Sequence, residues 1–156
     1  MADTKTPTKR SAGTSGEVWT DEERAAMQAS ARERKSASRR DPAAELAQGE
    51  RDHRESIAKM PDADRAMAER IDAVVMTAVP GLARKTYYGM PAYAKDGNVI
   101  CWIKNAGKFK MRYDTIEFSD KAHLDDGAMW PASYAVKELS SAVEAKIVAI
   151  VKKAAG

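Results

Sequence analysis

Carboxylate side chains recur along a predicted helix in the middle of the chain. They lie off the apolar face of a helix predicted over residues 62–79, at Asp62, Asp64, Glu69 and Asp72. Carboxylate oxygens gathered on one surface could hold a hard cation or Fe²⁺. The alternative is an ordinary solvated helix face, because acidic side chains also favour the positive end of a helix dipole. Arg65 and Arg70 are interleaved with the acids and would partly neutralise a metal site.

A second acidic group follows a histidine later in the chain. His123, Asp125 and Asp126 fall within four consecutive residues. An imidazole and two carboxylates could begin a metal site. The alternative is a polar loop held by local Asx-turn hydrogen bonds, since chelation needs further ligands that the spacing does not predict.

Aromatic side chains gather in the run 85–93, which reads Lys-Thr-Tyr-Tyr-Gly-Met-Pro-Ala-Tyr. Aromatic and methionine side chains with a few polar groups are the usual lining of small-molecule sites. We therefore predict a pocket lined by Tyr87, Tyr88, Met90, Tyr93, Trp102 and Trp130. The alternative is that these side chains fill the core, where aromatic residues dominate the energetics of small domains.

Basic residues alternate along the strand predicted over residues 109–113. Lys108, Lys110 and Arg112 would share one face of it. Such a stripe suits a small anionic ligand or an acidic partner protein, and we predict that Lys110 and Arg112 bind it. A solvated sheet face would produce the same pattern.

No catalytic motif stands out in the sequence. There is no nucleophile–base pair at a telling spacing, no phosphate-binding loop and no cysteine-rich zinc motif, so the sequence does not indicate an enzyme. The single cysteine, Cys101, lies in the most apolar run and is predicted to be buried and inert. A further hypothesis is an enzyme whose active site is assembled from residues that lie far apart in the sequence. No cofactor is certain from the residues alone.

Composition excludes several classes of protein. The 156 residues suit one domain, and the net charge of +3 comes from signs that alternate along the chain. Nucleic-acid binding would need clustered Lys and Arg, so it is not expected. No apolar run approaches the roughly 18 residues of a membrane span, and no signal peptide is recognisable. We therefore expect a cytoplasmic protein without a membrane partner.

The segments that must position these residues are helical in the first half of the chain. Residues 1–18 are predicted to be a disordered tail, and residues 19–49 a helical extension. The capping box Thr20-Asp21-Glu22-Glu23 starts its first helix, and Asp41-Pro42 interrupts it. Further helices are predicted over 43–60 and 62–79, the second with Asp62 as its cap and Pro80-Gly81 as its end.

The residue pattern in the second half of the chain predicts a sheet. Strands are expected at 86–88, 92–95, 98–104 and 109–113 and near Tyr134, with a short helix at 119–123. Asp96-Gly97 favours a type I′ hairpin turn. A final helix follows a capping box at Ser141. The predicted fold is α+β: a twisted antiparallel meander whose apolar face is packed by the N- and C-terminal helices.

Several of these segments together resemble one family. They are the run Tyr88-Gly89-Met90-Pro91-Ala92-Tyr93, the Asp96-Gly97 hairpin, the lysine-rich strand and residues 124–139. The chain resembles the YdhG-like proteins of the domain-of-unknown-function 1801 group over about residues 50–156. That resemblance implies a YdhG-like α+β domain. Because the group includes bacterial frataxin-like iron chaperones, it also implies weak iron binding by the carboxylates of helix 62–79 and delivery to an acceptor protein.

Two functional hypotheses follow. The first is an iron-delivery protein, which the resemblance implies. The second is a non-catalytic binding module that receives a small anionic ligand or a partner protein through the aromatic segment Tyr87–Tyr93.

Overall fold

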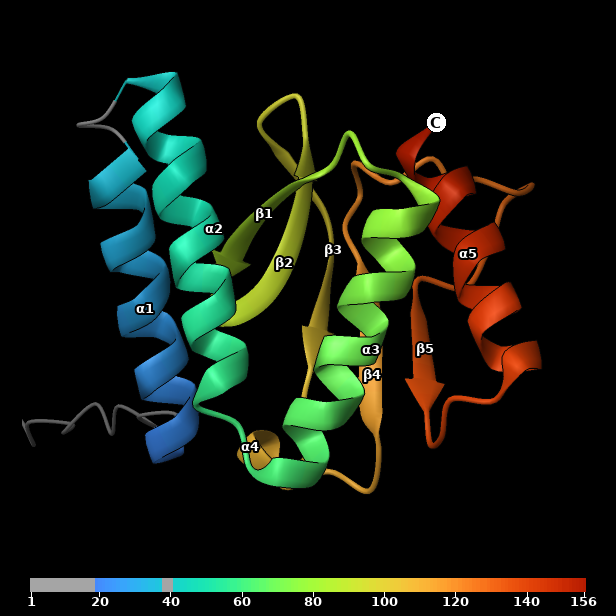
Figure 1. Cartoon of the computed structure of the whole chain (residues 1–156), viewed down its shortest axis with the longest axis horizontal. Coiled ribbons are helices and arrows are strands. Elements are labelled where there is room, and N and C mark those ends of the chain that lie inside the picture. The colour runs from blue at the N-terminus through green and yellow to red at the C-terminus, as the bar shows by residue number, and fades with distance from the viewer. Residues whose placement is uncertain (1–18, 38–40) are drawn as a thin grey trace, which may run out of the picture.

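The computed structural model describes residues 19–37 and 41–156, which form an α+β fold (Figure 1). The tail predicted over residues 1–18 lies outside the described residues. The sheet has five strands in the order β1-β2-β3-β4-β5, and each strand is antiparallel to the next. The strands are β1 (Ala83–Tyr87), β2 (Met90–Lys95), β3 (Asn98–Lys104), β4 (Asp114–Phe118) and β5 (Ser133–Val136). The predicted α+β meander is confirmed.

The apolar run predicted to be a central strand is β3, which lies between β2 and β4. Ile100, Cys101 and Ile103 are each at most 3% exposed. Cys101 is buried as predicted, and burial raises the pKa of its thiol to about 12. The hairpin turn before β3 places Asp96 at φ 50° and Gly97 at φ 81°, the positive values that a type I′ turn requires.

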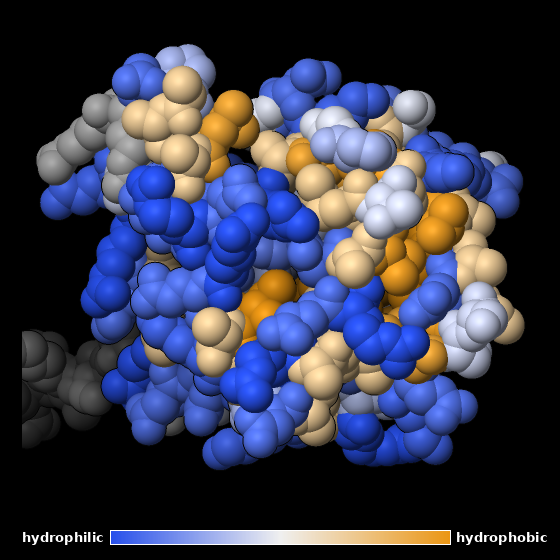
Figure 2. Space-filling model, viewed as in Figure 1, coloured by the Kyte–Doolittle hydropathy of each residue, from blue (hydrophilic) through white to orange (hydrophobic). Residues whose placement is uncertain are grey.

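Two long helices cover one face of the sheet. They are α3 (Asp62–Ala78) and α5 (Ser141–Ala155), which lie side by side in Figure 1. Ile71 and Val75 of α3 and Val151 of α5 join the same buried apolar cluster as Ile103 and Ile116 of the sheet. Figure 2 shows apolar side chains gathered between α3 and α5 and hydrophilic ones over most of the N-terminal helices. The amphipathic faces predicted for both helices therefore form the core.

A third helix, α2 (Pro42–Ala58), packs against β1. Asp41 caps it by accepting from the Ala44 N–H at 2.8 Å, and Pro42 follows at the first helical position, as the break in the sequence implied. A side chain on Gly49 would bring Cβ within 2.8 Å of the Arg84 carbonyl oxygen, so the close approach of α2 to β1 depends on glycine. The boundary predicted between residues 49 and 50 falls inside this continuous helix.

The first helix, α1 (Asp21–Ala37), is loosely packed. Its predicted capping box is present, since the Thr20 hydroxyl accepts from the Glu23 N–H at 3.1 Å and the Glu23 carboxylate from the Thr20 N–H at 2.8 Å. Among its described side chains, only Ala26 and Ser30 are buried. No helix among the described residues has the length and apolar character to cross a membrane.

The prediction of a strand over residues 109–113 is wrong. The chain forms a short helix there, α4 (Ala106–Phe109), and leaves it at Lys110 in the left-handed conformation. Two carboxylates hold this turn: Asp114 accepts from the Ala106 N–H at 2.6 Å and Asp64 from the Gly107 N–H at 2.9 Å. The strand begins after the turn, as β4. The basic stripe predicted along one sheet face therefore does not exist.

Two smaller predictions near the C-terminal end are also wrong. Residues 119–123 form turns instead of a short helix. The last helix is capped one residue earlier than predicted, by Ser140, whose hydroxyl accepts from the Val143 N–H at 3.3 Å. The strand predicted near Tyr134 is confirmed as β5.

Candidate functional site

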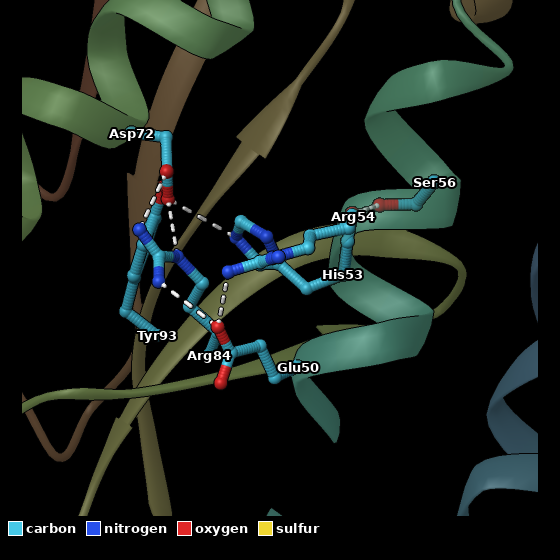
Figure 3. A network of polar contacts seen from close by, with 7 residues as sticks. All are labelled: Glu50, His53, Arg54, Ser56, Asp72, Arg84 and Tyr93. Carbon is cyan, nitrogen blue, oxygen red and sulfur yellow. Dashed lines mark hydrogen bonds and ion pairs between the residues drawn. The ribbon is translucent and has the colours of Figure 1, made fainter. Parts of the chain in front are cut away.

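A polar network joins α2, α3, β1 and β2 (Figure 3). The Arg84 guanidinium donates to both carboxylate oxygens of Asp72, at 3.0 Å to Oδ1 and 2.8 Å to Oδ2. The Tyr93 hydroxyl donates to Asp72 Oδ1 at 2.8 Å. Burial opposes ionisation of Asp72, but these hydrogen bonds hold its pKa below the ordinary value. Asp72 is thus an ionised carboxylate that is already bound by protein donors.

His53 is the least satisfied member of this network. It is 1% exposed, and neither ring nitrogen has a hydrogen-bond partner among the described residues. Its Nε2 lies 3.7 Å from Asp72 Oδ1, and its ring meets the Tyr93 ring edge-on at 5.1 Å between centroids. Burial lowers the pKa of His53 to about 4, although the nearby Asp72 charge opposes the shift. The imidazole is therefore neutral near pH 7.

A groove of about 690 Å³ lies between the two N-terminal helices and β1. Side chains from α1, α2, β1, β3 and the two hairpin turns that join β1, β2 and β3 line it, including Arg34, Leu46, Lys85, Tyr87, Tyr88 and Val99. Lys85 and Tyr87 alternate along β1 with Arg84, which reaches Asp72 of α3. They therefore point to the outer side of the sheet, away from α3. This groove is where the predicted aromatic segment is accessible.

Three of the predicted pocket aromatics come together on this outer side. The Tyr87 ring lies 4.6 Å from the Tyr88 ring and 4.6 Å from the Trp102 ring, measured between centroids. The Trp102 indole donates to Glu117 at 2.9 Å, which fixes its orientation. Tyr87 and Tyr88 line the groove, and Trp102 supports Tyr87 from β3.

The other predicted ligand-binding residues lie elsewhere. Met90 and Tyr93 are buried, and the Tyr93 hydroxyl is bound to Asp72. Trp130 is in the loop before β5 and makes no ring contact with the described aromatic residues of the groove. Lys110 and Arg112 follow α4 in an exposed turn, and neither lines the groove.

The acidic residues predicted to bind metal are mostly engaged separately. Asp62 pairs with Arg65 at 2.8 Å, Asp64 accepts from the Asn105 amide and the Gly107 N–H, and Glu69 is exposed. Among the residues that the structure describes, no group of three or more His, Cys, Asp or Glu side chains could hold a metal ion. This holds equally for the exposed set at His123, Asp125 and Asp126.

Sequence reasoning missed His53, Arg84 and Glu50, which meet only in the folded protein. Oε1 of Glu50 lies 3.5 Å from Nη1 of Arg84 and 2.6 Å from Nη2 of Arg54. A weak signal was present for His53, because it lies four residues before the predicted anchor Ile57 and hence on the same side of the helix.

Comparison with known proteins adds no relative: no protein-family model matches the chain, and no curated protein or solved structure matches it significantly. The resemblance to YdhG-like proteins, and the iron delivery that it implies, stay predictions.

Proposed function

We propose that the protein is a non-catalytic binding module for a small aromatic anion, which it receives in the groove between α1, α2 and β1. The observation that carries the proposal is the groove itself, about 690 Å³ in volume and lined by Tyr87 and Tyr88 of the aromatic segment. Small-molecule sites in proteins typically measure about 300–1,000 Å³ and combine aromatic walls with a few polar groups.

The lining favours a flat, largely apolar ligand body. Tyr87 is held between Tyr88 and Trp102, so its ring is oriented before any ligand arrives. Leu46 of α2 also lines the groove and is 58% exposed. An aromatic ligand between these side chains would cover apolar surface and gain ring contacts of about 0.5–1.5 kcal/mol each.

Two basic side chains of the lining, Lys85 and Arg34, could meet an anionic group on that ligand. Lys85 and Arg34 make no ion pair with another described residue, and Lys85 lies on the same side of β1 as Tyr87. Two acids of the lining are already occupied, since Glu33 accepts from the Gly89 N–H and Asp52 from Gln48. Two more acids, Glu45 in the first turn of α2 and Asp96 in the β2–β3 turn, also line the groove.

A pair of fluorescent probes tests the proposal. Anilinonaphthalene sulfonate is an aromatic anion, and phenylnaphthylamine is its neutral counterpart. We expect saturable binding of both, with the anion tighter. Tyr87→Ala should weaken both probes by about fivefold to tenfold, as expected for a lost aromatic contact. Lys85→Gln should weaken the anion alone.

The matched control is Lys110→Gln, which removes an exposed lysine outside the groove and should change neither probe. Circular dichroism of each variant confirms that it remains folded. The proposal is wrong if neither probe saturates, or if Tyr87→Ala and Lys110→Gln bind both probes equally well.

A further inference from the structure

A second cavity, of about 290 Å³, opens between α2 and α3 on the other side of the polar network. It shares no lining residue with the groove. Two helices form its walls, with His53, Arg54, Ile57 and Ala58 from α2 and Arg65, Glu69 and Asp72 from α3. Its volume is at the lower end of the range for ligand sites, which suits a molecule of amino-acid size.

Charges of both signs face this cavity. Arg54 and Arg65 supply guanidinium groups, and Glu69 and Asp72 supply carboxylates. Both arginines are held only by solvent-exposed pairs, Arg54 with Glu50 at 2.6 Å and Arg65 with Asp62 at 2.8 Å. Such pairs contribute about 0–1 kcal/mol, so exchanging them for a ligand carboxylate costs little.

The acidic side of the cavity is open to a ligand ammonium group. Glu69 makes no hydrogen bond or ion pair with another described residue, and it lies in the same wall as Asp72. Asp72 Oδ2 accepts one hydrogen bond, from Arg84, whereas a carboxylate oxygen has two acceptor positions. An ammonium group between Glu69 and Asp72 would therefore find unoccupied acceptors.

The inner wall carries the unsatisfied imidazole. His53 is 1% exposed, and its Nε2 stands 3.7 Å from Asp72 Oδ1, too far for a hydrogen bond. Buried polar groups without partners are rare, and each needs an explanation. The 3.7 Å gap leaves no room for an atom on the line between the two groups, so a ligand atom would partner the imidazole from the cavity side, after a small turn of the ring that exposes a nitrogen.

We infer that the cavity between α2 and α3 is a binding site for a small zwitterion of the α-amino-acid class. Its carboxylate would meet Arg54 and Arg65, its ammonium group Glu69 and Asp72, and a short aliphatic side chain Ile57 and Ala58. A purely anionic or purely cationic molecule would leave one pair of charged side chains without a partner.

The test uses the imidazole ¹⁵N resonances of the full chain, because His53 and His123 are its two histidines. Glycine, alanine and valine are titrated at pH 7, with acetate and methylammonium as the two half-ligands. We expect a saturable shift of the His53 resonances by the amino acids alone. The exposed His123 reports non-specific effects within each sample.

Variants separate this site from its surroundings. Arg65→Gln and Glu69→Gln should each weaken binding by about tenfold, the ratio for loss of one charged contact. Arg70→Gln is the matched control, because Arg70 lies on the same helix but pairs with Glu144 outside the cavity. Tyr87→Ala in the groove should also have no effect.

Three results would overturn the inference. One is the absence of a saturable His53 shift with any of the amino acids. Another is an equal response to acetate or methylammonium, which would mean that one charge suffices. The third is binding unchanged by both Arg65→Gln and Glu69→Gln. Because the groove is tested with other probes and variants, either site can fail without the other.

Discussion

His53 makes the stability of this protein depend on pH. The pKa of its side chain falls from 6.5 in the unfolded chain to about 4 in the folded protein, mainly because of burial. The unfolded state therefore binds more protons between these values. The stability contributed by neutral His53 is present above pH 6.5 and is lost as the pH falls toward 4, by about 3 kcal/mol in total.

Urea denaturation between pH 7 and pH 4 measures this loss directly. In His53→Gln the pH dependence across this window should largely disappear, whereas His123→Gln, which changes an exposed histidine, should retain it. Asp72 acts at lower pH. Its pKa is depressed below 3.8, so its contribution is lost only as the pH falls through that depressed value. An unchanged slope in His53→Gln would show that other groups cause the loss.

Asp72 is the residue on which the polar network depends. Asp72→Asn removes the charge that Arg84 and Tyr93 share, and it leaves the partly buried guanidinium with only the more distant carboxylate of Glu50, at 3.5 Å. We expect the free energy of unfolding to fall by about 2–3 kcal/mol. Asp62→Asn is the control, since Asp62 is 95% exposed and its pair with Arg65 should contribute below about 1 kcal/mol. Chemical denaturation with equal losses in both variants would contradict this ranking.

At the scale of elements, the contact between α2 and β1 depends on one glycine. Gly49→Ala would place Cβ 2.8 Å from the Arg84 carbonyl oxygen, so the helix must move away from the strand. Alanine favours the helix by about 1 kcal/mol, but the displaced packing costs about 1–3 kcal/mol. We expect a net loss of about 1 kcal/mol, measured by urea denaturation.

Gly81→Ala is the matched control for this contact, because a Cβ there meets nothing within 4 Å. Its effect should be neutral or slightly stabilising, since alanine restricts the unfolded chain more than glycine does. If Gly49→Ala were as harmless as Gly81→Ala, α2 would not be fixed against β1 at this point.

At the scale of the whole molecule, one buried apolar cluster connects α2, α3, the sheet and α5. Ile57, Ile71, Ile103 and Val151 belong to it, whereas none of the described side chains of α1 does. Elements that share one core tend to unfold together, and elements outside it open locally at lower free energy.

Native-state hydrogen exchange tests this division. Amides in the middle of α3, β3 and α5 should exchange only through global unfolding, with the same denaturant dependence. Amides of α1 should exchange much faster, although Glu33 of that helix accepts from the Gly89 N–H. Equal protection of α1 and α3 would show that α1 is part of the cooperative unit. Because α1 also forms one wall of the groove, its opening would change access to the proposed ligand site.

Local chemistry in the sequence determined most of the elements of this protein. Capping residues such as Thr20 and Asp41, the helical spacing of apolar residues in 62–79 and the Asp96-Gly97 turn act between neighbours along the chain, so their effects can be predicted from the sequence. The apolar run in β3 likewise identified the central strand, because a strand that is covered on both faces tolerates few polar residues. The aromatic segment was recognisable from its composition, although only Tyr87 and Tyr88 of it reach the groove.

Tertiary structure alone decided the contacts between distant segments. The turn at α4 replaced a predicted strand because Asp64, from a different helix, binds its backbone. Asp72 was predicted to be a metal ligand, but Arg84 and Tyr93 donate three hydrogen bonds to its carboxylate and leave one acceptor position of Oδ2 open. His53 became an unsatisfied buried group because α3, β1 and β2 close around it. The physical reason is common to all three: hydrogen bonds, burial and pKa shifts depend on which groups meet in space, and the periodicity of one segment carries no information about its partners.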